Sequence, residues 1–135
     1  MSERVINVSF ELTDNWEVEG FRNFIKILMS DDGYNVFIIS NDDSSAYITK
    51  VGETIGLPES NVIICNFTND KIQAITDNNI DIHFDNLQSF ILLVDNTTDA
   101  SGVMVTHLLN KYYLRPDYVI IFERLIAEII KDEQE

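Results

Sequence analysis

Polar side chains with the chemistry of phosphate handling follow several short apolar runs of this chain. Ser9, Glu11 and Thr13 alternate directly after the first run. Others come later in the sequence: Ser40 with Asn41, Lys71, and Asp85 with Asn86. Phosphoryl transfer to a carboxylate needs a nucleophile, a cation that neutralises the phosphate and an acid that protonates the leaving oxygen. Magnesium, which often assists, prefers hard oxygen ligands such as carboxylates.

The elements that must position these groups alternate between two kinds of apolar pattern. We expect strands over residues 5–10, 36–39, 62–65, 80–84 and 90–94, and helices over 16–29, 44–55, 71–76, 103–113 and 118–131. Alternating strands and helices are typical of βαβ units with a parallel sheet. The strands are nearly continuous apolar runs, which indicates a sheet buried on both faces. The sequence therefore predicts one α/β domain over residues 1–135, a three-layer, Rossmann-like parallel sheet of about five strands.

The polar groups fall where such a fold places its binding site. In open α/β sheets the site lies at the carboxyl ends of the strands, at the point where strand order reverses. The expected ends are residues 9–13, 40–43, 66–70, 85–86 and 95–98, and all of these segments are polar. We therefore expect a single crevice at this edge of the sheet.

The order and spacing of four of these motifs, from Val5 to about Leu109, resembles the haloacid dehalogenase (HAD) superfamily, whose members are mostly magnesium-dependent phosphatases. The first motif of that family is Asp-x-Asp-x-Thr, and its first Asp is the nucleophile. In this alignment Ser9 stands at the nucleophile, Glu11 at the acid/base Asp and Thr13 at the Thr. The segments 13–21 and 49–70 are too short for a cap domain, so the resemblance implies a small, capless, nucleotidase-like member.

The resemblance also implies roles for the later residues. Ser9, Glu11 and Lys71 would be the catalytic positions, and the phosphate would contact Thr13, Ser40, Asn41 and Lys71. Asp85 would ligate magnesium, with Asn86 in place of a frequent second Asp. Because Ser9 cannot form an aspartyl-phosphate and removes a carboxylate from the metal, we expect magnesium binding to be weak or absent.

Three functions remain open on this sequence. The first is a catalytically impaired HAD-like protein that acts as a binding or assembly module, motivated by Ser9. The second is an active phosphomonoesterase that uses metal-activated water, motivated by Lys71 and Asp85. The third is a structural or interaction subunit, and homo-oligomer, that associates through the C-terminal helix, which carries an unusually wide apolar face: Val119, Ile120, Ile121, Phe122, Leu125, Ile126, Ile129 and Ile130.

The composition of the chain excludes some classes of binding partner. The chain has 9 basic and 23 acidic residues, a net charge of −14, so a nucleic-acid backbone would be repelled. A phosphorylated small molecule or a protein remains the expected partner. No apolar run approaches the roughly 20 residues that span a bilayer, and the N-terminal charges are not followed by the long apolar region of a signal peptide, so we expect a cytoplasmic protein.

Several polar residues also have purely structural explanations. Ser9, Glu11 and Asp85 can be strand-end or solvated residues, and Ser40 can belong to a helix-capping cluster. His83 alternates with apolar neighbours and fits a packing histidine, and the single cysteine, Cys65, fits a buried thiol in a strand. One cysteine allows neither an internal disulfide nor a multi-thiolate zinc site.

Overall fold

Five parallel strands form the sheet at the centre of the molecule. The computed structural model describes residues 5–12, 19–40, 45–104 and 127. The strands are β1 (Ile6–Phe10), β2 (Tyr34–Ser40), β3 (Val62–Ile64), β4 (Ile82–Asp85) and β5 (Ser101–Met104). Their order is β3-β2-β1-β4-β5, so the chain builds outward from β1 in one direction and then returns to build in the other. The order therefore reverses between β1 and β4.

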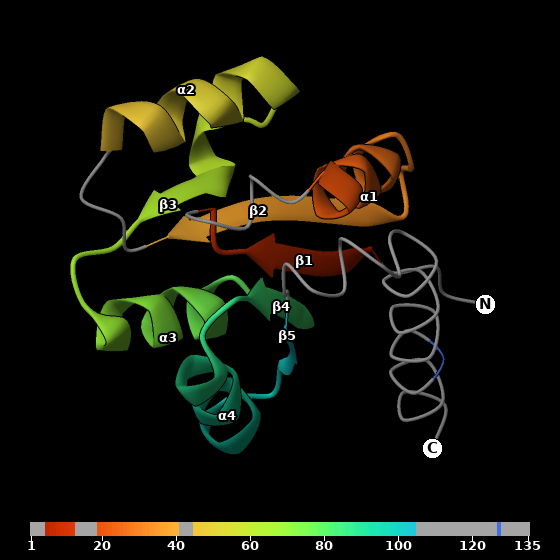
Figure 1. The fold of residues 1–135 in the computed structure, drawn as a ribbon. Helices are drawn as coiled ribbons and strands as arrows, with labels where there is room; N and C mark the ends of the chain where they lie inside the picture. Colours follow the sequence, from red (N-terminus) through yellow and green to blue (C-terminus); the bar gives the residue numbers. More distant parts are fainter. Residues whose placement is uncertain (1–4, 13–18, 41–44, 105–126, 128–135) are drawn as a thin grey trace.

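Helices cover both faces of this sheet. They are α1 (Glu19–Met29), α2 (Ser45–Ile55), α3 (Thr68–Asp77) and α4 (Gln88–Thr97), with a short 3-10 helix, η2 (Glu59–Asn61), before β3. Figure 1 shows α1 and α2 above the sheet and α3 and α4 below it. The expected α/β fold with a three-layer, Rossmann-like parallel sheet is confirmed.

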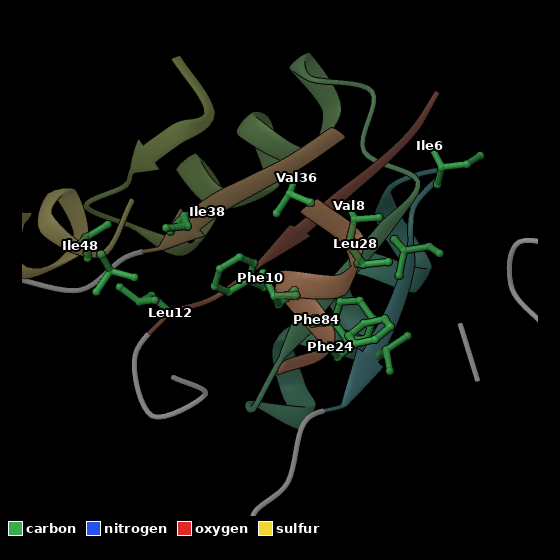
Figure 2. Close-up of a cluster of buried hydrophobic side chains, with 14 residues drawn as sticks. Ile6, Val8, Phe10, Leu12, Phe24, Leu28, Val36, Ile38, Ile48 and Phe84 are labelled. Carbon is green, nitrogen blue, oxygen red and sulfur yellow. The ribbon is translucent and has the colours of Figure 1, made fainter. Parts of the chain in front are cut away.

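Alternation along β1 divides its side chains between the two faces. Even-numbered residues from Ile6 to Leu12 point toward α1 and α2, where they form an apolar core with Phe24 and Phe84 (Figure 2). The rings of Phe24 and Phe84 meet edge to face, with centroids 5.5 Å apart. Odd-numbered residues point toward α3 and α4, and on the central strands β1 and β4 this second face is polar rather than apolar.

The predicted last strand is wrong. Residues 90–94 lie in α4, and the fifth strand is β5, within the segment where we expected a helix to begin. A run of five apolar residues carries too little periodicity to separate strand from helix. In α4 the buried residues are Phe90, Ile91 and Val94, at helical spacing, while Leu92 is 53% exposed. Residues 95–97 therefore belong to a helix and not to the carboxyl edge of the sheet.

This difference gives a direct test. In a strand, Phe90, Leu92 and Val94 would share one face and Ile91 the other, whereas in α4 Ile91 is buried and Leu92 is exposed. We expect Ile91→Lys to lower the free energy of unfolding by about 2 kcal/mol or more, because it buries an unpaired charge. Leu92→Lys should change it by no more than about 0.5 kcal/mol. Urea denaturation of both proteins measures this, and the opposite order would contradict the position of α4.

Candidate active site at the carboxyl edge of the sheet

Side chains from three strands and one helix meet where the strand order reverses. Glu11 follows β1, Ser40 ends β2, Asp85 ends β4 and Lys71 lies in the first turn of α3. All four are buried, with 0–3% of each residue exposed. A pocket of about 230 Å³ opens onto three of them, and its lining consists of Glu11, Thr68, Lys71, Asp85, Asn86, Leu87 and Phe90.

The ammonium of Lys71 lies between two carboxylates. Its Nζ donates to Oε1 of Glu11 at 2.8 Å and to Oδ2 of Asp85 at 3.0 Å. The same Nζ lies 4.2 Å from the centre of the Phe90 ring, a cation–π contact. Two carboxylates and one ammonium leave this centre with one negative charge in excess.

The remaining carboxylate oxygens also have partners. The hydroxyl of Ser40 donates to Oε2 of Glu11, and the backbone N–H of Leu87 donates to Oδ1 of Asp85 at 3.0 Å. Burial raises the pKa of Asp85, but the contacts with His83 and with Lys71 outweigh it, so the pKa of this carboxyl lies below its ordinary value. Asp85 is therefore held as a carboxylate.

A buried hydrogen-bond chain continues from Asp85 into the protein interior. His83 Nε2 lies 3.1 Å from Oδ2 of Asp85, and His83 Nδ1 lies 2.7 Å from the Ser9 hydroxyl. Both Ser9 and His83 have no exposed surface. Burial is the largest influence on the pKa of His83 and lowers it below its ordinary value, although Asp85 acts in the opposite direction. A neutral ring then donates from Nε2 to Asp85 and accepts the Ser9 proton at Nδ1.

Together these contacts form a polar ladder between β1 and β4. Its levels are Asn7–Asp81, Ser9–His83 and Glu11–Asp85, all on the face toward α3 and α4. At the first level the backbone N–H of Asn7 donates to Oδ2 of Asp81 at 2.9 Å. Ser9 and His83 are direct neighbours across the two strands. At the third level Lys71 joins the two carboxylates.

The predicted site residues fall into three groups. Glu11, Ser40, Lys71 and Asp85 come together, and Asn86 lines the same pocket. Ser9 lies one level deeper, where His83 separates it from Asp85, and it does not line the pocket. Thr13 and Asn41 lie outside the described residues, as does the predicted C-terminal helix except for residue 127.

Sequence reasoning missed the contribution of His83 and of Phe90. Both β1 and β4 carry polar residues two positions apart near their carboxyl ends, Ser9 with Glu11 and His83 with Asp85. Had the two strands been paired in advance, this matching spacing would have placed His83 beside Ser9. Phe90 could not have been found, because residues 90–94 were assigned to a strand.

The donor set does not fit a magnesium ion as it is arranged. Two carboxylates are the correct ligand class, but the Lys71 ammonium binds an oxygen of each and takes the position between them. Within the described ranges, no cluster of three or more His, Cys, Asp or Glu side chains is placed to hold a metal. The cation that neutralises these carboxylates is the lysine.

The single cysteine lies beside this centre, where the backbone N–H of Cys65 donates to the carbonyl of Ser40 at 2.7 Å. Cys65 follows β3, and it is buried and not in a disulfide. Burial, with a smaller contribution from Asp70, raises the pKa of its thiol. A protonated, buried thiol is a poor nucleophile, in agreement with the expected packing role.

Comparisons with known proteins leave the family open. No family model matches the chain, and no curated protein matches it. None of the helices in the described part of the chain is long and apolar enough to cross a membrane.

Proposed function

We propose that this chain is a HAD-like protein whose catalytic centre is inactive, and that it acts as a binding or assembly module. The observation that carries this proposal is the Lys71 bridge between Glu11 and Asp85, at 2.8 and 3.0 Å. Every oxygen of these two carboxylates has a protein partner, and the residues are only 3% and 1% exposed. A carboxylate held in this way is a poor nucleophile toward phosphate, because attack would first break a buried ion pair.

Within this proposal, Glu11 rather than Ser9 takes the first acidic position of the HAD pattern. The backbone N–H of Glu11 donates to the carbonyl of Phe84, the residue before Asp85, at 2.9 Å. Glu11 and Asp85 therefore lie opposite each other at the carboxyl ends of two neighbouring strands. Ser9 has no exposed surface and its hydroxyl is engaged by His83. With this alignment the chain keeps an acid at the first position, and the feature that opposes catalysis is the neutralising lysine.

Phosphate release from a panel of phosphomonoesters, with and without magnesium, tests the inactive centre. The control is Asp85→Asn, which keeps the shape of the side chain and removes its charge. We expect the wild-type chain to release no more phosphate than this variant. Magnesium-dependent turnover that is lost in Asp85→Asn would contradict the proposal.

That contradictory outcome would favour an active phosphomonoesterase. The observation in its favour is that Thr68, Lys71 and Asn86 supply hydrogen-bond donors to the same small pocket as the two carboxylates. The Glu11 carboxylate would take a proton from the water as the water oxygen bonds to phosphorus, the ester P–O bond would break, and Glu11 would pass that proton to the leaving oxygen. Such a site would accept the phosphate end of a substrate and leave the rest outside.

Two matched substitutions test which residue stands at the first acidic position. Ser9→Asp should restore magnesium affinity if Ser9 holds that position. In the structure this carboxylate would instead face His83 below the pocket, so we expect no increase in magnesium affinity by isothermal titration calorimetry. Glu11→Asp, which shortens the acid by one methylene and loosens its contact with Lys71, should have the larger effect on magnesium affinity. A gain confined to Ser9→Asp would reverse the assignment.

A further inference from the structure

A second hollow lies on the opposite face of the sheet, between α1 and α2. It has a volume of about 920 Å³, which is within the range of ligand sites. Its cationic lining residues are Arg22 and Lys26 from α1 and Lys50 from α2, and its apolar lining residues are Met29, Val51 and Ile55. We call this surface the α1–α2 groove.

The charge of the groove is opposite to that of the chain. Only 9 of the 135 residues are Lys or Arg against 23 Asp or Glu, yet three of the nine line this groove. Among the described residues, no Asp or Glu lines it. The side chains of Lys26 and Lys50 are exposed, so an acidic ligand can pair with either of them.

The floor of the groove is apolar. Val51 is buried, and Met29 and Ile55 are partly buried against the core beneath α1 and α2. Tyr47, which is 42% exposed, adds an amphipathic ring at one side. An apolar floor with a charged rim is typical of a groove that accepts an amphipathic helix.

Two other classes of anion fit less well. The groove includes the carboxyl ends of both helices, at Met29 and Ile55, where the helix dipole is negative and opposes a compact anion such as phosphate. A nucleic acid would face the net charge of −14 over the rest of the chain. A ligand whose carboxylates are distributed along both helices places little charge at the helix ends, so the helix dipole opposes it less. A short ligand stays within the groove and meets less of the negative charge on the rest of the chain.

We propose that the α1–α2 groove binds an acidic amphipathic helix of a partner protein. Apolar side chains of that helix lie on Met29, Val51 and Ile55, and its Asp and Glu side chains pair with Lys26 and Lys50. Both walls are 11-residue helices, so the groove accommodates a few turns of a partner helix. The surface is on the other side of the sheet from Lys71, so this inference does not depend on whether that centre is active.

The test uses a fluorescently labelled 14-residue peptide of Leu, Ala and Glu in amphipathic spacing, with the full chain as receptor. The matched probe carries Lys in place of every Glu. We expect fluorescence anisotropy at about 150 mM salt, where the long-range effect of the net charge is screened, to show binding of the acidic peptide only. The double variant Lys26→Gln/Lys50→Gln should weaken it about fivefold or more, since each exposed ion pair contributes up to about 1 kcal/mol.

Two further variants test whether binding depends on the charges and on the apolar floor of the groove. Gln73→Glu/Gln88→Glu lowers the net charge by the same two units on α3 and α4, and it should leave the Kd unchanged. Ile55→Gln, checked for folding by circular dichroism, should weaken binding through the floor alone. The proposal fails if the acidic peptide does not bind, if both charge variants weaken it equally, or if Ile55→Gln has no effect. Competition by ATP or inorganic phosphate at the same groove would also overturn it, since a compact anion would then be the ligand.

Discussion

Lys71→Met is expected to be among the most destabilising single substitutions in the chain, costing about 3–5 kcal/mol of the free energy of unfolding at pH 7. Methionine fills a similar volume but leaves Glu11 and Asp85 buried beside each other without the ammonium that lies between them. Two adjacent buried carboxylates share a proton, so part of the lost stability should return as the pH falls toward 5. Urea denaturation at pH 7 and pH 5 measures both effects.

Two further proteins separate the charge effect from the loss of the lysine stem. Gln73→Met, on the exposed side of α3, should change the free energy of unfolding by no more than about 0.5 kcal/mol. Lys71→Met/Glu11→Gln removes one charge of each sign, and we expect it to be more stable than Lys71→Met alone. The stability lost by the double variant should be smaller than the sum of the losses of the two single variants. A loss below about 1 kcal/mol for Lys71→Met would mean that the bridge does not hold the centre together.

Buried His83 is expected to make the fold sensitive to mild acid. Because its pKa in the folded protein lies below the ordinary value of 6.5, the unfolded chain binds more protons below pH 6.5. Stability is therefore full above that pH and falls as the pH drops toward the lowered folded value, by up to about 1.4 kcal/mol per pH unit. Asp85, whose pKa is also lowered, adds a further loss below its ordinary value of 3.8.

His83→Gln tests the origin of this acid sensitivity. Glutamine can accept from Ser9 and donate toward Asp85, but it does not titrate. We expect the variant to be less stable at pH 7, through imperfect packing, and to show a flatter decline between pH 6.5 and pH 5. His107→Gln, at the chain's only other histidine, measures how much of the decline belongs to that residue. If His107→Gln flattens the profile and His83→Gln does not, His83 is not the sensor.

The fold class could be predicted because the alternation of buried strands with helical spacing is strong in the first two thirds of the chain. Residues 5–10 and 36–39 are short runs rich in Val, Ile and Phe, each next to a segment with helical spacing, which is typical of buried strands. The prediction failed at residues 90–94, where a five-residue run does not distinguish strand from helix and only the packing of Ile91 against β5 decides. A local pattern cannot contain that information.

The types of residue in the candidate site could be predicted from the sequence, but the distance of each residue from the pocket could not. Glu11, Ser40 and Asp85 are expected together because the carboxyl ends of parallel strands meet, and the family resemblance adds Lys71 to them. The difference between Ser9 and Glu11 could not be predicted, because it depends on which residue of β1 stands level with Asp85 of β4. Ser9 and Glu11 are two positions apart, and residues at this spacing point to the same face of a sheet. The alternation in the sequence therefore does not show which of the two lies in the pocket.

The polar ladder has a consequence for how the chain finds its fold. If β1 slid by two residues along β4, every apolar side chain would still face its correct layer, so hydrophobic burial alone discriminates poorly against that error. The slide would place Ser9 opposite Asp85 and Glu11 beyond the end of β4, so His83 would lose Ser9 and Lys71 would lose Glu11 in a buried environment. Unpaired buried polar groups cost far more than the apolar contacts gain. The same atoms that resemble a catalytic centre would thus select one alignment of the two central strands, and this is a reason for keeping them that does not depend on catalysis.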